Sequence, residues 1–393
     1  MNTSAIVSER MGNVPFSGIR EIFEQAKRLE ESGASITHME IGRPDFDTPA
    51  HIKAAAIEAL ESGQVHYGSN RGIPELGRAI AERLERENGI RVDPETEVLV
   101  TVGCTEAVLV AFLAFLGQGE EVLLPEPSWQ MYVGGAELVG GRPVSVPLRE
   151  ENRFEVDPGD VAARITPRTK MLVLCSPHNP TGAVVETVRA LAELCLEHDL
   201  LVLSDEIYDK MLYDGAEHTS IASLPGMFER TVTINGFSKA YAMDGWRLGY
   251  AAGHRELVRP MLKAHQHATT CANTFAQFGA AAAYRGPQEC VSEMVGEFDR
   301  RRRFLVEALN DLPGVSCATP RGAFYAFPAF RGYEMGSRAM AAYLLEEARV
   351  ACVPGTVFGA GGEEFIRLAY STDYESIVAG AERMRVALGR LRG

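Results

Sequence analysis

Two basic side chains stand eight residues apart in the mostly apolar and small stretch Asn235–Tyr250. Lys239 follows a β-branched run, and Arg247 opens the next strand-like run. A lysine in a desolvated pocket has a lowered pKa and becomes a usable nucleophile or base. An arginine beside it suits a bidentate contact with a phosphate. The alternatives are an ordinary surface lysine and a surface ion pair between Arg247 and Asp244.

Other polar residues also follow apolar runs. Gly103, Cys104 and Thr105 join such a run to a helical pattern. A glycine allows a close turn, and a helix N-terminus attracts phosphate, although a Gly-Thr start can also be a plain helix cap. Asn179 lies in "SPHNPTG", a fixed turn that presents its side-chain amide. Its alternative is an asparagine that only forms the turn.

A carboxylate ends the apolar run "LLVLSD" at Asp205, with Tyr208 three residues later. Burying a carboxylate is costly unless a cation pairs with it. The alternatives are a helix N-cap for Asp205 and aromatic packing for Tyr208. Together, the residues that follow these apolar runs supply a phosphate cradle, an amide, a carboxylate with a tyrosine, and a lysine with an arginine. The sequence has no metal-ligand cluster, Ser-His-Asp order or nucleotide GxGxxG to accompany them.

The runs themselves are mostly unbroken rather than alternating, which is typical of strands covered on both faces of a mostly parallel sheet. In such sheets ligands lie outside the carboxyl ends of the strands, where the polar residues above would meet. The predicted strands cover residues 98–101, 121–125, 142–147, 170–175, 200–205, 231–235 and 247–253.

Helical patterns at 105–117 and 185–199 alternate with these strands, which predicts an α/β domain over about residues 45–290. The C-terminal part differs, and we expect it to form a smaller α+β domain from residues 1–44 and 291–393. A helix over about 16–32 would pack with it. Its other predicted elements are helices at 293–311 and 337–350 and strands at 322–330 and 365–371.

Composition narrows the function classes. The 393 residues carry a formal net charge of −14, which argues against a nucleic-acid surface or an anionic membrane surface. The N-terminus has no apolar signal region, and no apolar run approaches the ~20 residues needed to span a bilayer. The seven cysteines are scattered and form no CxxC, which indicates reduced thiols and a cytoplasmic protein.

At this point the chain resembles the class I/II pyridoxal-phosphate-dependent aminotransferases of the aspartate aminotransferase fold, fold type I. The resemblance covers nearly the whole chain in motif order and spacing. It implies a mostly parallel sheet with helices on both faces in a large domain, plus a smaller α+β domain. The motifs are "GRPDFDTP", "HYGSNRGIPELGRAI", "VTVGCTEA", "PEPSW", "SPHNPTG", "SDEIY", "NGFSKAYAMDGWRLGY", "GAFYAFP" and "FIRLAYS".

The resemblance also implies roles around pyridoxal 5′-phosphate. Lys239 would form the internal aldimine and later move the substrate's proton. Asp205 would pair with the pyridine nitrogen, while Asn179 and Tyr208 would hydrogen-bond the ring 3-oxygen. Trp129 would stack on the ring. The phosphate would be held by Gly103, Cys104, Thr105, Ser238, Arg247 and, from the neighbouring subunit of a homodimer, Tyr67.

For the substrate, the resemblance implies that Arg367 holds the α-carboxylate, helped by Asn179 and the Gly42 backbone. Arg20 and Arg43 are candidates for a side-chain contact. The chain departs from many relatives at Gly236, where a serine would supply a phosphate hydroxyl, and at Asp244, which adds a negative charge. Cys104 is expected to be the one cysteine in the site and to tolerate replacement by alanine.

The implied activity is amino-group transfer between an L-amino acid and a 2-oxo acid by a ping-pong mechanism, in amino acid metabolism or biosynthesis. Aspartate, aromatic and neutral donors are all open. The second hypothesis is another reaction on the same cofactor, such as a β-lyase, decarboxylase or oxidase. The third is a non-catalytic cofactor-binding regulatory module, which the acidic charge and the lack of a preceding winged-helix segment disfavour.

Overall fold

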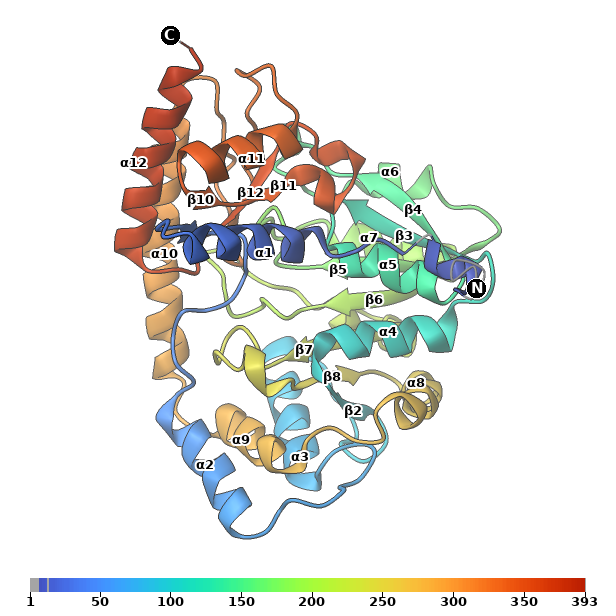
Figure 1. Ribbon diagram of the computed structural model, residues 1–393. Helices are drawn as coiled ribbons and strands as arrows, with labels where there is room; N and C mark the ends of the chain where they lie inside the picture. Colours follow the sequence, from blue (N-terminus) through green and yellow to red (C-terminus); the bar gives the residue numbers. More distant parts are fainter. Residues whose placement is uncertain (1–6, 13, 393) are drawn as a thin grey trace.

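A seven-stranded sheet forms the centre of the larger part of the structure, a computed structural model that describes residues 7–12 and 14–392 (Figure 1). Its strand order is β2-β8-β7-β6-β5-β3-β4. Only β8 runs antiparallel to its two neighbours, so the predicted mostly parallel sheet is confirmed. The strands are β2 (Val98–Thr101), β3 (Glu121–Glu126), β4 (Arg142–Pro147), β5 (Thr169–Cys175), β6 (Leu201–Asp205), β7 (Thr231–Gly236) and β8 (Gly249–Ala252).

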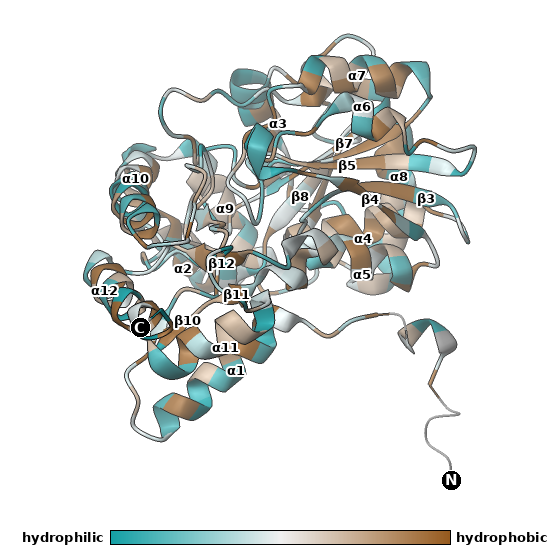
Figure 2. Cartoon of the chain, turned by 90° about the horizontal axis from the view of Figure 1, so that it is seen from above, coloured by the Kyte–Doolittle hydropathy of each residue, from teal (hydrophilic) through white to brown (hydrophobic). Residues whose placement is uncertain are grey.

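Helices cover both faces of this sheet (Figure 2). In β3, Val122 and Leu124 pack on one face with α4, α5 and α8, while Leu123 packs on the other with α6 and α7. Both faces are therefore apolar, which explains the unbroken runs in the sequence. The helices are α4 (Gly103–Phe115), α5 (Gln130–Leu138), α6 (Pro158–Ala162), α7 (Val188–Glu197) and α8 (Arg255–Ala268).

A further group of helices packs against β2 and β8 at one edge of the sheet. Its buried side chains join those of Val98, Val100 and Tyr250 in one cluster. The group consists of α2 (Ala50–Glu61), α3 (Pro74–Arg83) and α9 (Thr274–Arg285). None of the helices in the described residues combines the length and apolarity needed to cross a membrane.

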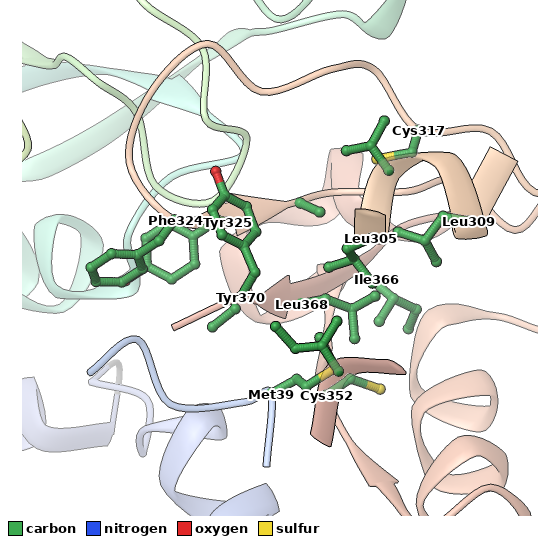
Figure 3. Close-up of a cluster of buried hydrophobic side chains, with 14 of the residues drawn as sticks. Met39, Leu305, Leu309, Cys317, Phe324, Tyr325, Cys352, Ile366, Leu368 and Tyr370 are labelled. Carbon is green, nitrogen blue, oxygen red and sulfur yellow. The ribbon is translucent and has the colours of Figure 1, made fainter. Parts of the chain in front are cut away.

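A second core gathers residues from both ends of the chain, including Met39, Leu305 and Leu368 (Figure 3). The helix α1 (Gly18–Glu31) packs through Ile22 and Ala26 on Leu345 and Ala351, as expected for the N-terminal helix. The domain boundaries themselves stay a prediction. The other elements of this part are β1 (Thr37–His38), α10 (Glu289–Asn310), β9 (Tyr325–Ala326), α11 (Ser337–Glu347), β10 (Val350–Ala351), β11 (Val353–Pro354), β12 (Ile366–Ala369) and α12 (Tyr374–Arg390).

Several predicted elements of this second part are wrong in extent, and two of them are bounded by a residue with a left-handed backbone. The helix expected over 337–350 ends at Glu347, because Arg349 takes a left-handed backbone with φ 56° and the chain then enters β10. The strand expected over 322–330 is reduced to Tyr325–Ala326. Ala323 has φ 56°, which interrupts an extended chain before that strand.

Gly249 of β8 lies directly behind the first turn of α4. A Cβ on this residue would come 2.7 Å from the backbone nitrogen of Cys104 and 2.8 Å from the carbonyl carbon of Gly103. Backbone atoms cannot rotate away as side chains do. The first turn of α4 can therefore lie this close to β8 only because residue 249 has no side chain.

We therefore expect Gly249→Ala to lower the free energy of unfolding by about 1–3 kcal/mol through overpacking. Urea denaturation of the two variants and the wild type measures this difference. Gly245→Ala is the matched control, since a Cβ there meets no atom within 4 Å. Equal denaturation midpoints for the two variants would contradict the close approach.

Candidate active site

The polar residues at the strand ends line one cavity of about 410 Å³. The ends of β5, β6 and β7 are in register, with Cys175 paired to Asp205 and Asp205 paired to Ile234. Side chains that follow these ends therefore meet at one edge of the sheet. Of the residues expected in the site, the lining includes Gly42, Cys104, Thr105, Trp129, Asn179, Asp205, Tyr208, Ser238, Lys239, Arg247 and Arg367.

The carboxylate of Asp205 is buried at the end of β6 and is only 2% exposed. The hydroxyl of Tyr132 donates to Oδ2 at 2.7 Å, and the backbone N–H of Ile207 donates to Oδ1 at 3.3 Å. Within the described part of the chain, no cationic side chain lies within 4.0 Å of it. Burial raises the pKa of Asp205 to about 6, while the two hydrogen bonds act in the opposite direction.

Lys239 points its amine into the same cavity from the loop after β7. Its Nζ donates to the carbonyl oxygen of Gly42 at 2.7 Å and lies 5.6 Å from the ring centre of Phe324. Burial lowers the pKa of Lys239 to about 8, although the charge of Asp244 acts to raise it. The alternative of an ordinary surface lysine is therefore wrong.

Asp244, which the sequence left without a role, lines the cavity as well. Its backbone carbonyl accepts a hydrogen bond from Nη1 of Arg247 at 2.8 Å. Among the ion pairs of residues 7–12 and 14–392 there is none between the two side chains, so the expected alternative of a surface ion pair is wrong. The carboxylate instead acts on Lys239, where it opposes the loss of the amine's proton.

An anion cradle is built around the first turn of α4. Gly103 has φ +78°, and a Cβ there would lie 2.6 Å from Nη2 of Arg247, so this glycine leaves room for the guanidinium. Gly103 itself is not among the lining residues, whereas the nearby Ser238 is, and it is 8% exposed. The N–H groups of a first helical turn have no partners within the helix and attract anions.

Gly236, the departure three residues before the lysine, has a steric explanation. A Cβ at this position would lie 3.0 Å from Cα of Gly249 and 3.1 Å from Sγ of Cys104. The thiol of Cys104 therefore occupies space that a side chain at position 236 would need. Burial raises the pKa of the Cys104 thiol, which keeps it protonated.

Arg367, on β12, is 1% exposed and packs over the ring of Tyr325 at 4.6 Å. Its Nη1 donates to Oδ1 of Asn179 at 3.1 Å, and its Nη2 donates to the carbonyl oxygen of Glu40. No carboxylate side chain among the described residues pairs with it, and its buried Nε has no acceptor. This guanidinium is therefore suited to a carboxylate brought in by a ligand. The hydroxyls of Tyr208 and Tyr325 lie 2.8 Å apart.

Several lining residues were missed by reasoning from the sequence. Tyr132 lies one helical turn after Trp129, and their rings pack edge to face at 5.4 Å, so the spacing could have indicated it. Tyr325 belongs to the quoted motif "GAFYAFP". Cys175 also lines the cavity, so the expectation that Cys104 is the one cysteine there was wrong. Burial raises the pKa of Cys175 to about 12.

Tyr67 and Arg43 do not line the cavity, whereas Arg20 does. Tyr67 is 89% exposed and lines a separate hollow of about 320 Å³ together with residues 271–275. Its contact with a neighbouring subunit stays a prediction.

Comparison with known proteins gives a consistent picture over nearly the full chain. A family model described as aminotransferase class I and II matches residues 34–384. An aspartate aminotransferase of Pyrococcus abyssi is 44% identical over 386 residues, covering 97% of this chain and 98% of that protein. The aromatic-amino-acid aminotransferase 2 of Thermococcus litoralis is 42% identical over 386 residues, covering 97% and 98%. The crystal structure of the aromatic aminotransferase from Pyrococcus horikoshii superposes with a TM-score of 0.89 at 44% identity, covering 93% and 99%.

The first site prediction concerns Lys239 and Asp244. In the protein without a bound ligand, Lys239 should titrate near pH 8, and Asp244→Asn should lower that pKa further, because a carboxylate that favours the ammonium form is lost. NMR of ¹⁵Nζ-labelled lysine, assigned by the signal missing from Lys239→Ala, measures both. Asp47→Asn is the control: it removes a carboxylate that pairs with the exposed Lys53, and it should leave the pKa of Lys239 unchanged. An unchanged or raised Lys239 pKa in Asp244→Asn would exclude the electrostatic role.

The second concerns Tyr132 and Asp205. Tyr132→Phe should raise the pKa of Asp205 above about 6, because the hydroxyl that stabilises the carboxylate is lost. Since an acid with a raised folded-state pKa loses stability as pH rises between the unfolded and folded values, the decline should extend to higher pH in the variant. Carboxyl ¹³C NMR and urea unfolding between pH 4 and 8 test this. Tyr343→Phe, whose hydroxyl donates to Ala387, is the control that should leave Asp205 unaffected.

Proposed function

Because the chain belongs to the class I and II aminotransferases and is therefore an enzyme of the transaminase type, we propose that it uses pyridoxal 5′-phosphate to move an amino group from an L-amino acid to a 2-oxo acid. The observation that carries the proposal is a single cavity with two opposed perturbed groups. One is the buried carboxylate of Asp205, which has no cationic partner among the described residues. The other is the amine of Lys239, whose pKa is lowered.

The residues present fit this cofactor. Asp205 lacks a cation in the described structure, and a protonated pyridine nitrogen would supply one. The first turn of α4 with Arg247 offers N–H donors and positive charge to a phosphate. Trp129 offers an aromatic face at the cavity wall. When bound, the cofactor supplies an electron-withdrawing ring that stabilises negative charge at the substrate α-carbon.

The chain's own groups then have separate tasks. Lys239 takes the proton from the substrate α-carbon and returns it, for which a pKa near 8 suits neutral pH. Arg367 and Asn179 hold the α-carboxylate in a buried position and so orient the bond that loses its proton. Tyr208 presents a hydroxyl whose pKa is raised by burial and which stays a donor. The two substrates bind this one site in turn, in a ping-pong cycle.

We propose aspartate and aromatic amino acids as donors. Arg20 lines the cavity, is exposed, and takes part in no ion pair within the described residues. It is a cation free to bind the side-chain carboxylate of an acidic substrate. Trp129 offers apolar surface to an aromatic one. The printed names of the relatives divide between the same two substrate classes.

The alternatives predict other products. A β-lyase, decarboxylase or oxidase shares the lysine, aspartate and phosphate groups, and ammonia release without amino transfer would favour the first or last of these. A non-catalytic module is disfavoured by membership of an enzyme family. A homodimer completed by Tyr67, a role in amino acid biosynthesis, and a cytoplasmic location stay proposals. The seven free thiols support the location.

The assay follows single half-reactions, with one amino donor at a time and no acceptor, by the cofactor's absorbance. Aspartate and phenylalanine should both convert the wild-type enzyme, and Lys239→Ala should convert with neither. Borohydride treatment of the loaded enzyme followed by peptide mapping should mark Lys239. A mark on another lysine would refute its assignment.

Arg20→Met should weaken use of aspartate about tenfold while leaving phenylalanine unchanged, because only the acidic donor loses a charged hydrogen bond. Arg43→Met is the matched control, since this arginine is exposed and lies outside the cavity lining. Equal losses for both donors would show that Arg20 does not select for the side-chain carboxylate.

A further inference from the structure

A buried carboxylate lies behind the anion cradle, and the proposed chemistry does not use it. Glu106 is in the first turn of α4 and is 9% exposed. Its Oε2 accepts a hydrogen bond from the backbone N–H of Val102 at 2.5 Å. Val102 is the N-cap residue of α4, and its own side chain cannot cap a helix. The side chain of Glu106 therefore reaches back and satisfies the cap's free N–H, as in a capping box.

The other oxygen of Glu106 connects this turn to the end of α8. Oε1 accepts from the hydroxyl of Thr269 at 2.7 Å and lies 2.8 Å from Nδ1 of His265, which is fully buried. Thr269 is the C-cap residue of α8. The carboxylate is therefore bound to two residues of a second helix, and Glu106 is not among the residues that line the cavity.

This arrangement determines where the cradle's donors point. Residues Gly103, Cys104 and Thr105 are the first three of α4, whose N–H groups have no acceptor inside the helix. Gly249 closes the rear of the same turn. A negative charge in a phosphate-binding turn would repel the phosphate if it faced the ligand. Here it faces the interior, and its hydrogen bond to Val102 holds the residue that precedes the three donors.

We propose that Glu106, held by His265 and Thr269, is a positioning residue that keeps the first turn of α4 in register with a bound phosphate. The identity of that phosphate as the cofactor's rests on the proposed function. The role requires a hydrogen-bond acceptor at position 106, not a charge.

The test compares the affinity of the cofactor-free enzyme for pyridoxal 5′-phosphate and for pyridoxal, which lacks the phosphate, by equilibrium titration of absorbance. Glu106→Ala should weaken the phosphorylated form about 5- to 30-fold, the range expected for loss of a helix cap, and pyridoxal by less than about twofold. Glu106→Gln, whose amide oxygen can still accept from Val102, should stay within about threefold of the wild type. Thr269→Val should also weaken the affinity for pyridoxal 5′-phosphate, by a smaller factor. This variant replaces Glu106→Ala as the test if Glu106→Ala does not fold.

Glu155→Ala is the matched control. Glu155 accepts hydrogen bonds from the backbone N–H groups of Glu186 and Thr187 at the start of α7, away from the cavity lining. It should change neither affinity. Equal weakening of both ligands by Glu106→Ala, or a Glu106→Gln variant as weak as Glu106→Ala, would overturn the inference. If wild type binds pyridoxal 5′-phosphate no better than pyridoxal, the proposed cofactor fails instead.

Discussion

The structure of the site depends on one buried carboxylate, that of Asp205, which forms no ion pair among the described residues. An unpaired buried charge costs several kcal/mol, and here the hydroxyl of Tyr132 and the N–H of Ile207, with a contribution from the charge of Lys239, offset part of that cost. Those two donors reach it because α5 begins beside the cavity and because β6 ends in register with β5 and β7. The protein therefore holds a carboxylate that is only partly stabilised until a cation arrives. Under the proposed function, the protonated pyridine nitrogen of the cofactor would be that cation.

A second property of the site is that three of its cationic side chains donate hydrogen bonds to uncharged groups. Lys239 donates to the Gly42 carbonyl, Arg367 to the Asn179 amide, and Arg247 to the Asp244 carbonyl. None of the three forms an ion pair in the described structure. Their positions are thus fixed by hydrogen bonds to uncharged oxygens, one each for Lys239 and Arg247 and two for Arg367, and not by ion pairs. A negatively charged ligand group can then pair with one of these cations without first breaking an existing ion pair.

Much of the sheet could be predicted, because most of its strands are short runs of buried residues that stop at a polar residue or a turn. The edge strands β2 and β4 match the predicted ranges 98–101 and 142–147 residue for residue. The same rule found Cys104, Thr105, Asn179, Asp205, Tyr208, Lys239 and Arg247. Gly42, Trp129, Ser238 and Arg367 came only from the family resemblance, and Tyr132, Cys175 and Tyr325 were missed. What could not be predicted depends on contacts between distant segments. The hydrogen bond from Tyr132 to Asp205 joins residues 73 positions apart, and β10 pairs with β1 across more than 300. The effect of Asp244 on Lys239 depends on loop geometry that no periodic pattern encodes.

The contacts of Arg367 and Lys239 with the segment Glu40–Gly42 also determine when the site can form during synthesis. The segment leaves the ribosome early, but its partners lie 327 and 197 residues further along the chain. Until α11 and β10 have been made, β1 and α1 have no place to dock, and the apolar face of α1 stays in water. Loop closure over such lengths is slow, so the nascent chain must carry an unfinished cavity and exposed apolar surface through most of its translation. A site assembled from both ends of the chain therefore forms only when translation is nearly complete.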